Sequence, residues 1–514
     1  MIRSREVCLL SAGFESQFHL IRMEDLMRKK GILWAVLLAG AGFVMNPPAV
    51  SDEKWWKISA DDLSDKIQGG LLGQILGNLN GLPHEMQYIA EPGAVEAYTP
   101  ALPEGAWTDD DTDIEWIYAA GMQRFNQIFL TPEEIVQLWK THINTRIWCA
   151  NEYARRLMDI GLVPPWTGTF AFNPWSDFNI SGQFLSEAFG LIAPGMPQTA
   201  ARTGLHYTHT GIEGEPAQAT QMFTGMIATA FFTQNVDEIL DAGLAMLDPK
   251  SVLRAIVKDV REWHAENPGD WRATRQRVKE TYSRHDGAMR DRNGYELNTA
   301  STIAALLYGG GDFVRTLVTA FNFGWDADNN AATAATIVGV IQGRRWLDSQ
   351  GWNIVDRYRN TTRDAMPGNE TITDYGNRLI ELAGKVILEQ GGRKQDENGQ
   401  MMFWISAENP IPVESLPDLA EKQRVLQSTM KDEIGKSLSR PVDDTQLARA
   451  AYWAIGLDLT ETMRKRYPEA WLNAVKALED HPNLIRSLFT SPVPAAERLR
   501  EKARLAGIRQ PPAP

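Results

Sequence analysis

The feature that most constrains the fold is a run of small residues between Gly324 and Gly343. From Asn330 onward, Ala, Thr and Gly occupy every side of a helical wheel, so neighbouring backbones can approach from all directions. We therefore expect this helix to be central. Asp326 and Asp328 stand directly before it, and buried carboxylates need hydrogen bonds, a proton or a cation. A metal ion is the natural partner at this helix mouth.

A second acidic cluster, Asp109 to Asp111, lies far upstream and also precedes a predicted helix. Thr112 and Glu115 have the spacing of a capping box, and apolar residues follow at the helical period as far as Ile128. The three carboxylates are therefore expected to project from a helix N-terminus, where the helix dipole favours their ionised form. The two clusters are predicted to converge on one site.

Acidic runs before helices also have a simpler interpretation, in which each is a solvated, capped helix start. Two runs, each opening a helix rich in small or apolar residues, favour the shared site instead. Hard cations such as Mg²⁺ take oxygen ligands, which clustered carboxylates supply without His or Cys. Two magnesium ions are therefore expected.

Three motifs, in this order along the chain, resemble those of the ADP-ribosylglycohydrolases. The segment from Gly70 to Glu85 is similar to the family's N-terminal Gly-rich helix, which ends in Gly-x-Pro-x-Glu. Asp109 to Thr112 resembles its Thr-Asp-Asp-Thr signature, as does Thr108 to Asp111 if one residue is inserted. Gly324 to Ala332 resembles its Gly-x-Asp-x-Asp-Thr signature and the Ala-rich helix that follows. The resemblance covers roughly residues 60 to 365.

The resemblance implies an all-α, orthogonal multi-helix bundle with a di-metal cleft between the mouths of its helices. It implies hydrolysis of the glycosidic bond of an ADP-ribosyl or related nucleoside-diphosphate ribose group, on a protein or a small ADP-ribosyl or ribosyl substrate. Paired metals would orient the substrate and activate water, and an unshared carboxylate would act as base. The expected metal ligands are Asp109, Asp110, Asp111, Asp326, Asp328 and Asn329. The expected catalytic residues are Asp110, Asp111, Asp328 and Glu85.

Four residues are assigned to substrate binding. Trp166 and Trp175 lie in an aromatic-rich loop, residues 161 to 179, and could stack on an adenine; alternatively, the aromatics hold the loop to the core. The family carries a histidine before a comparable helix, facing the ligand pocket, and His209 is assigned that role beside the alternative of a core or capping histidine. Asn78 is expected near the substrate.

The chain departs from the family pattern at three places. Asn329 replaces the family's Thr, Asn78 replaces its usual Asp, and the upstream cluster has an extra acid. Two alternatives to the glycohydrolase therefore stay open. One is a di-metal hydrolase of another glycoside or phosphoester, and the other is a non-catalytic ADP-ribose-binding relative. Glu85 has its own alternative, as a surface loop acid.

Composition sets the domain organisation. With 514 residues, 43% of them hydrophobic, the chain can build one large core with an appendage. Helical periods dominate and no convincing alternating run appears, which predicts an all-α fold. The predicted divisions are an ADP-ribosylglycohydrolase-like domain over 52–370 and, over 371–514, a linker marked by residues 391–399 and a helical C-terminal extension, which could make a dimer contact. The net charge of −13 disfavours a nucleic-acid surface.

Residues 1–51 are predicted to be a leader. Met27 to Lys30 is a positive segment, and an uncharged apolar run follows as far as Met45. Small residues before Ser51 suit a signal peptidase, so the protein is expected to be secreted or periplasmic, with no membrane span after processing. An uncleaved membrane anchor is the alternative.

Overall fold

Two helices in direct backbone contact, α2 (Ala60–Gly81) and α16 (Ala327–Gln342), form the centre of the fold. A Cβ atom on Gly69, Gly73 or Gly77 would lie 2.5, 2.2 or 2.4 Å, respectively, from a carbonyl oxygen of α16. The glycines are four residues apart and therefore share one helical face. Almost every residue of α16 is buried, which confirms the central position predicted from its small side chains.

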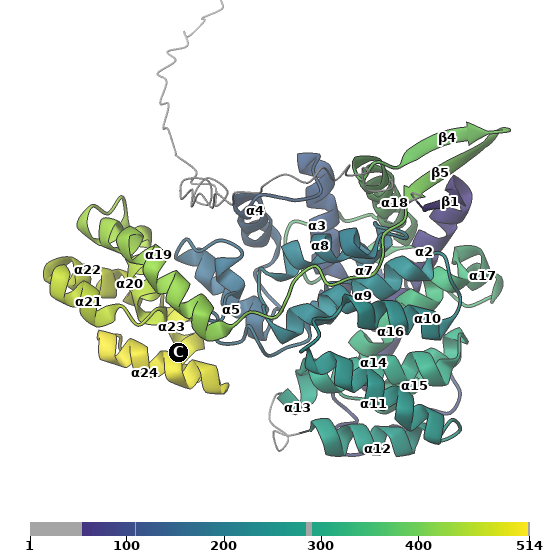
Figure 1. Cartoon of the computed structure of the whole chain (residues 1–514), viewed down its shortest axis with the longest axis horizontal. Coiled ribbons are helices and arrows are strands. Elements are labelled where there is room, and N and C mark those ends of the chain that lie inside the picture. The colour runs from purple at the N-terminus through teal and green to yellow at the C-terminus, as the bar shows by residue number, and fades with distance from the viewer. Residues whose placement is uncertain (1–53, 108, 284–289, 512–514) are drawn as a thin grey trace, which may run out of the picture. The chain divides into compact units, whose positions relative to one another are not determined.

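The computed structural model in Figure 1 describes residues 54–107, 109–283 and 290–511. The predicted leader lies outside these ranges. Among the helices that they contain, none has the length and apolarity needed to cross a membrane.

The remaining helices up to residue 389 surround this central pair. Helices α9, α14 and α15 pack against α16, while α17 and α18 pack against α2. The predicted all-α fold is confirmed. The bounds of these helices are α3 (Asp110–Phe125), α4 (Pro132–His142), α5 (Cys149–Asp159), α6 (Ser181–Phe184), α7 (Glu187–Leu191), α8 (Pro197–Thr208), α9 (Glu215–Ala230), α10 (Val236–Met246), α11 (Val252–Glu266), α12 (Trp271–Tyr282), α13 (Arg290–Asn293), α14 (Tyr295–Gly309), α15 (Phe313–Phe323), α17 (Arg344–Ser349) and α18 (Ile372–Glu389).

The start of α3 differs from the prediction. The side chain of Asp109 caps the helix by accepting a hydrogen bond from the Asp110 backbone N–H. Thr112 and Glu115 therefore lie inside the first turns, and the predicted capping box is wrong. Glu115 is fully buried and accepts a hydrogen bond from Gln74 at 2.8 Å, so its carboxylate joins α3 to α2.

A small sheet replaces the predicted linker and the first residues of the predicted helical segment. Strands β1 (Trp55–Ser59), β5 (Gln400–Ser406) and β4 (Arg393–Glu397) pair antiparallel in that order. Asn398 and Gly399 both have positive φ, as a two-residue hairpin turn requires. Elsewhere, the two-residue strands β2 (Ala106–Trp107) and β3 (Tyr358–Arg359) pair parallel. Helix α18, which was predicted to belong to the C-terminal part, packs on the central bundle.

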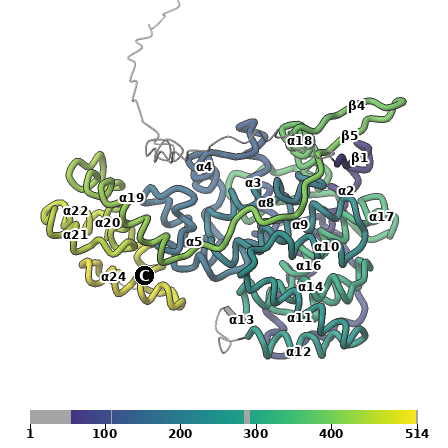
Figure 2. Tube along the Cα trace, in the orientation of Figure 1, coloured from purple at the N-terminus to yellow at the C-terminus, as the bar shows by residue number. Residues whose placement is uncertain are grey.

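The C-terminal extension is helical, as predicted from its amphipathic pattern. Figure 2 shows residues 407–418 running from β5 to α19 across α8 and α9, where Thr199 and Gln221 bond to the segment. The extension shares a hydrophobic core with α5 and the aromatic loop. Its helices are α19 (Leu419–Ser439), α20 (Asp444–Gly456), α21 (Thr460–Arg466), α22 (Pro468–Glu479), α23 (Pro482–Thr490) and α24 (Pro494–Ala506).

Polar side chains also hold the extension in place against this shared core. The hydroxyls of Tyr153 and Tyr452 lie 2.7 Å apart, and the Tyr452 hydroxyl also lies 2.7 Å from the Phe172 carbonyl oxygen. The Arg449 guanidinium donates to the Gly161 carbonyl oxygen at 2.8 Å. The extension is therefore seated against α5 and the loop by directional bonds as well as by apolar contact.

We expect Gly77→Ala to destabilise the protein by about 3 kcal/mol, the cost of overpacking a close backbone contact. The new Cβ would lie within 2.6 Å of three backbone atoms of Ala331 and Ala332, which cannot move aside as a side chain can. Urea unfolding measures the change. Gly269→Ala is the control, because nothing lies within 4 Å of a Cβ there. Equal stability of the two variants would contradict the proposed contact.

Candidate metal centre and adjoining cavity

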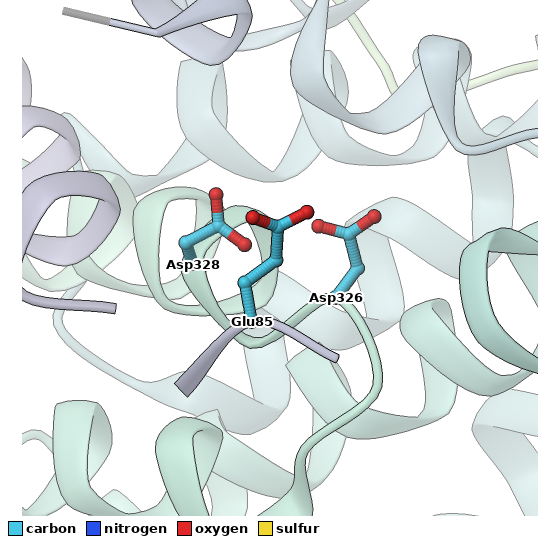
Figure 3. Close-up of side chains that lie close together, drawn as sticks. All are labelled: Glu85, Asp326 and Asp328. Atoms are coloured by element: carbon cyan, nitrogen blue, oxygen red, sulfur yellow. The ribbon is translucent and has the colours of Figure 1, made fainter. Parts of the chain in front are cut away.

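Three carboxylates meet where α2 and α16 meet. Glu85, Asp326 and Asp328 each offer an oxygen, and these oxygens lie within 4.8 Å of one another. Figure 3 shows them side by side, with Glu85 between the two aspartates. Asp326 is the N-cap of α16 and Asp328 lies in its first turn. Glu85 follows a single 3-10 turn, Leu82–His84, that continues the chain from α2. The backbone contact between the two helices therefore brings distant acids together.

The upstream acidic cluster reaches the same place. The Asn78 amide on α2 donates to Asp111 at 2.7 Å and also lies 3.3 Å from an Asp328 oxygen. Asp109 and Asp110 line the same cavity as Asp326 and Asp328. The structure thus brings together the two clusters that the sequence predicts to converge, and it makes Asn78 the link between them.

Several buried oxygen atoms in this cluster have no hydrogen-bond partner. They include one carboxylate oxygen of Asp328 and the amide oxygens of Asn78 and Asn329. The Asn329 amide nitrogen donates to Asp111 at 3.0 Å, which leaves its carbonyl oxygen free. Unpaired oxygen atoms of this kind are the ligands that Mg²⁺ or Ca²⁺ requires. The donor set therefore fits a hard divalent cation.

Burial makes this cluster electrostatically costly. Burial raises the pKa of Asp328 well above its usual value, and repulsion from Asp326 and Glu85 raises it further. The pKa of Asp111 is raised by burial and then by the charge of Asp328. Burial also raises the pKa of Asp110, Asp326 and Glu85. Without a cation, these groups can lie together only by retaining protons.

An arginine close to the α3 acids is paired with another carboxylate. Arg363 lies 2.9 Å from Asp113, and both side chains are inaccessible to solvent. Even with this partner, burial raises the pKa of Asp113 to about 7. In the described ranges, no Lys or Arg forms an ion pair with Glu85 or with the acids at 109–111, 326 and 328. A bound cation would supply positive charge that no ion pair provides to these acids.

A cavity of about 710 Å³ opens beside the carboxylates. Its volume is in the range of small-molecule and cofactor sites. Aromatic, amide and guanidinium groups complete the wall. Besides the acids, the lining includes Trp148, Asn151, Tyr153, Arg156, Trp175, Asn179, Phe184, Asn293 and Arg486.

Only one of the four residues assigned to substrate binding from the sequence lines the cavity. Trp175 lines the cavity, whereas Trp166, His209 and Asn78 are not among its lining residues. Sequence reasoning missed Arg156 and Arg486, because single arginines on amphipathic helices carry no distinguishing signal. It also missed Asn293, whose amide donates to Asp326. Asn293 lies outside the acidic motifs.

Comparison with known families agrees with this geometry. Residues 59–394 match the family model described as ADP-ribosylglycohydrolase. The chain belongs to the ADP-ribosylglycohydrolase family. A comparison with curated proteins found no match. The family match extends the resemblance from about residue 365 through α18 and into β4, and it ends before the helical extension. The acids described above all lie within the matched range.

His209 contacts the segment 407–418 and does not line the cavity. One ring nitrogen lies 2.7 Å from a Glu414 oxygen, and the other lies 3.0 Å from the Ile212 carbonyl oxygen. Burial acts to lower the pKa of His209, but the hydrogen bond and charge of Glu414 outweigh it, so the pKa is raised. The histidine is therefore placed to hold the connecting segment rather than a ligand.

We expect magnesium to stabilise the folded protein. The folded chain gathers acids from two distant segments and the unfolded chain does not, so binding favours the folded state. Free Mg²⁺ at about 100 times its dissociation constant should add about 2.7 kcal/mol to the free energy of unfolding. Thermal melts with magnesium and with chelator measure this. A midpoint that does not respond to millimolar Mg²⁺ would count against the site.

We also expect Glu414→Gln to destabilise the protein most between about pH 4.5 and 6.5. The pKa of His209 is raised on folding, so its contribution is present below its unfolded pKa of 6.5 and is lost as pH rises through the folded value. The pKa of Glu414 is lowered despite burial, because His209 bonds to it; its contribution is present above 4.5 and is lost as pH falls through the folded value.

Urea unfolding at pH 5.5 and pH 8.5 tests this pH dependence. The difference between wild type and Glu414→Gln should be larger at pH 5.5. Glu433→Gln, on the exposed face of α19, is the control and should show no such pH dependence. An equal loss at both pH values would mean that His209 is not charged in the folded protein.

Proposed function

We propose that this protein is a magnesium-dependent hydrolase that cleaves the glycosidic bond of an ADP-ribosyl or related nucleoside-diphosphate ribose group. The observation that carries the proposal is the meeting of two acidic clusters, with unpartnered oxygens, at a cavity of about 710 Å³. Membership of a glycohydrolase family supports a hydrolytic reaction. The cavity supports a substrate of nucleotide size.

The metal would be held by Glu85, Asp326 and Asp328, with the acids of α3 as further ligands. Magnesium suits this set because the donors are oxygens and because buried carboxylates need a cation. A bound divalent ion would supply positive charge beside substrate oxygens and lower the pKa of a coordinated water. Asn329 would add a neutral carbonyl oxygen.

The protein's own residues fix the geometry of the site. Asn78 bonds to Asp111 and lies within reach of Asp328, which holds acids of α3 and α16 at one separation. Asn293 and Asn298 hold Asp326 through its carboxylate and its backbone N–H. Preorganised groups of this kind need little rearrangement when charge develops in the transition state.

A carboxylate that is not shared with the metal would act as the general base. It would take a proton from the attacking water as the bond to the anomeric carbon forms, and the leaving group would depart with the electrons of the glycosidic bond. Of the four expected catalytic residues, Glu85 and Asp328 would be bound to the metal, so the base would be whichever of Asp110 and Asp111 does not ligate it. Burial and the charges of Asp109 and Asp111 raise the pKa of Asp110, and the Arg363 charge opposes this only in part, so a bound cation would be needed to hold Asp110 in the ionised form that a base requires.

We expect Asp328→Asn to lower magnesium affinity and turnover together. The change keeps size and polarity but removes a ligand charge, so affinity should fall about a hundredfold, the upper end for residues that support metal sites. Calorimetric titration with Mg²⁺, beside release of ADP-ribose from a modified peptide, measures both effects.

Two variants control this experiment. Asn329→Thr should retain both activities, because it restores the family's residue and a hydroxyl oxygen can also ligate. Asp444→Asn, in the exposed first turn of α20, should change neither. Normal magnesium binding and normal hydrolysis by the Asp328→Asn variant would contradict the proposed metal-dependent mechanism. Magnesium binding by the wild type without ADP-ribose release would indicate another substrate or a binding protein.

A further inference from the structure

The C-terminal extension supplies part of the cavity wall. Helix α23 and the residues after it contribute Asn483, Arg486, Ser487, Thr490 and Ser491 to the lining. These residues lie outside the range 59–394 that matches the family. This chain therefore has a cavity wall that the family segment alone does not provide.

Two arginines stand in this part of the cavity. Arg156 comes from α5 and Arg486 from α23, and the two helices pack against each other. In each guanidinium the Nε atom is buried and has no hydrogen-bond partner. Arg486 donates once, to Asn483 at 3.3 Å, while Arg156 forms an ion pair at 3.7 Å with Glu152, which also lines the cavity, without a hydrogen bond. The buried Nε atoms cannot reach a ligand, but both residues line the cavity and their terminal guanidinium nitrogens keep further N–H donors for one.

The cavity is rich in acids, so an anionic ligand would need the guanidinium groups of Arg156 and Arg486. The acids from α3, α16 and Glu85 repel an anion, and the chain as a whole carries a net charge of −13. Neither Arg156 nor Arg486 forms an ion pair with those acids in the part of the chain that the structure describes. A guanidinium offers paired N–H groups that match phosphate oxygens. Trp148 and Trp175 line the same cavity; Trp148 is exposed and can stack on a base, whereas Trp175 is buried against Phe178.

We propose that Arg156 and Arg486 bind the diphosphate of the substrate, so that the C-terminal extension completes the substrate site. The identity of the substrate rests on the proposed function. The anion site itself can be tested without turnover. Arg486 acts on affinity and specificity in this arrangement, and the acids carry the reaction.

The C-terminal extension is held firmly against α5 and the aromatic loop. Tyr452 of α20 bonds with both Tyr153 and Phe172, and the apolar core beneath it is continuous with α5 and the aromatic loop. Removing the extension would expose this core, so a truncated chain is unsuitable for the test. Single substitutions in the full chain avoid this problem.

The test compares Arg486→Gln and Arg156→Gln with the wild type, with magnesium present. Tryptophan fluorescence follows binding of ADP-ribose and of adenosine, which lacks the diphosphate. Each variant should bind ADP-ribose about tenfold more weakly, the loss expected for charge-assisted hydrogen bonds, while adenosine and Mg²⁺ binding stay unchanged. In turnover, KM should rise by a similar factor and kcat should stay within about twofold.

Matched controls separate this effect from structural damage. Arg498→Gln, exposed on α24 outside the cavity, should behave as the wild type. Arg486→Lys should recover part of the affinity because it keeps the charge. A merely structural role for Arg486 would weaken adenosine and ADP-ribose binding alike and lower the melting temperature, which would overturn the proposal.

Two results distinguish failure of this inference from failure of the proposed reaction. Wild-type protein that binds ADP-ribose through both arginines but releases none from a modified peptide would overturn the reaction and support the anion site. Wild-type protein that releases ADP-ribose, with Arg486→Gln unchanged in affinity and KM, would overturn the anion site and leave the reaction standing. Absence of ADP-ribose binding by the wild type would also overturn it.

Discussion

The backbone contact between α2 and α16 determines both the core and the site. A Cβ on Gly81 would lie 2.4 Å from the Asp328 Cα, so the two helices are in contact at the turn that carries the Asp328 carboxylate. Asn78 on α2 can bridge Asp111 and Asp328 only at this separation. Small residues in the centre of the molecule are therefore a condition for the geometry of the carboxylates. Packing and chemistry here depend on one contact.

This arrangement stores an electrostatic cost that a cation can relieve. The acids lie at the N-terminal ends of α3 and α16, where helix dipoles favour negative charge by a modest amount. Burial and mutual repulsion still raise the pKa of Asp111 and Asp328. The buried oxygen atoms that have no hydrogen-bond partner mark where a cation would offset this cost. Metal binding would thus be coupled to the proton content of the cluster as well as to folding.

Local features such as helices and their caps are predicted from the sequence better than contacts between distant segments. Small residues predict the central α16, and the spacing of Thr131 and Glu134 predicts the capping box that opens α4. The predicted capping box at Thr112 and Glu115 is absent because the helix begins earlier, with Asp109 as its N-cap. Glu115 is buried and accepts a hydrogen bond from Gln74 instead. Residues 391–399 predict a linker but form a short strand and a hairpin turn, because β4 is entirely polar and its apolar contacts come from the partner strand β5. The positions of His209 and Arg486 depend on segments distant in the sequence, and local pattern cannot place them.

The two ends of the cavity differ in what fixes them. The acidic end is held by α2, α3 and α16, where the backbone contact leaves no room for a larger side chain. The end formed by α5 and α23 is held by a separate core, which includes Tyr153 and Tyr452. Changes in α23 can therefore alter what the cavity accepts without moving the carboxylates. An appended helical segment can in this way adjust the substrate preference of a glycohydrolase fold while the reacting end of the site keeps its geometry.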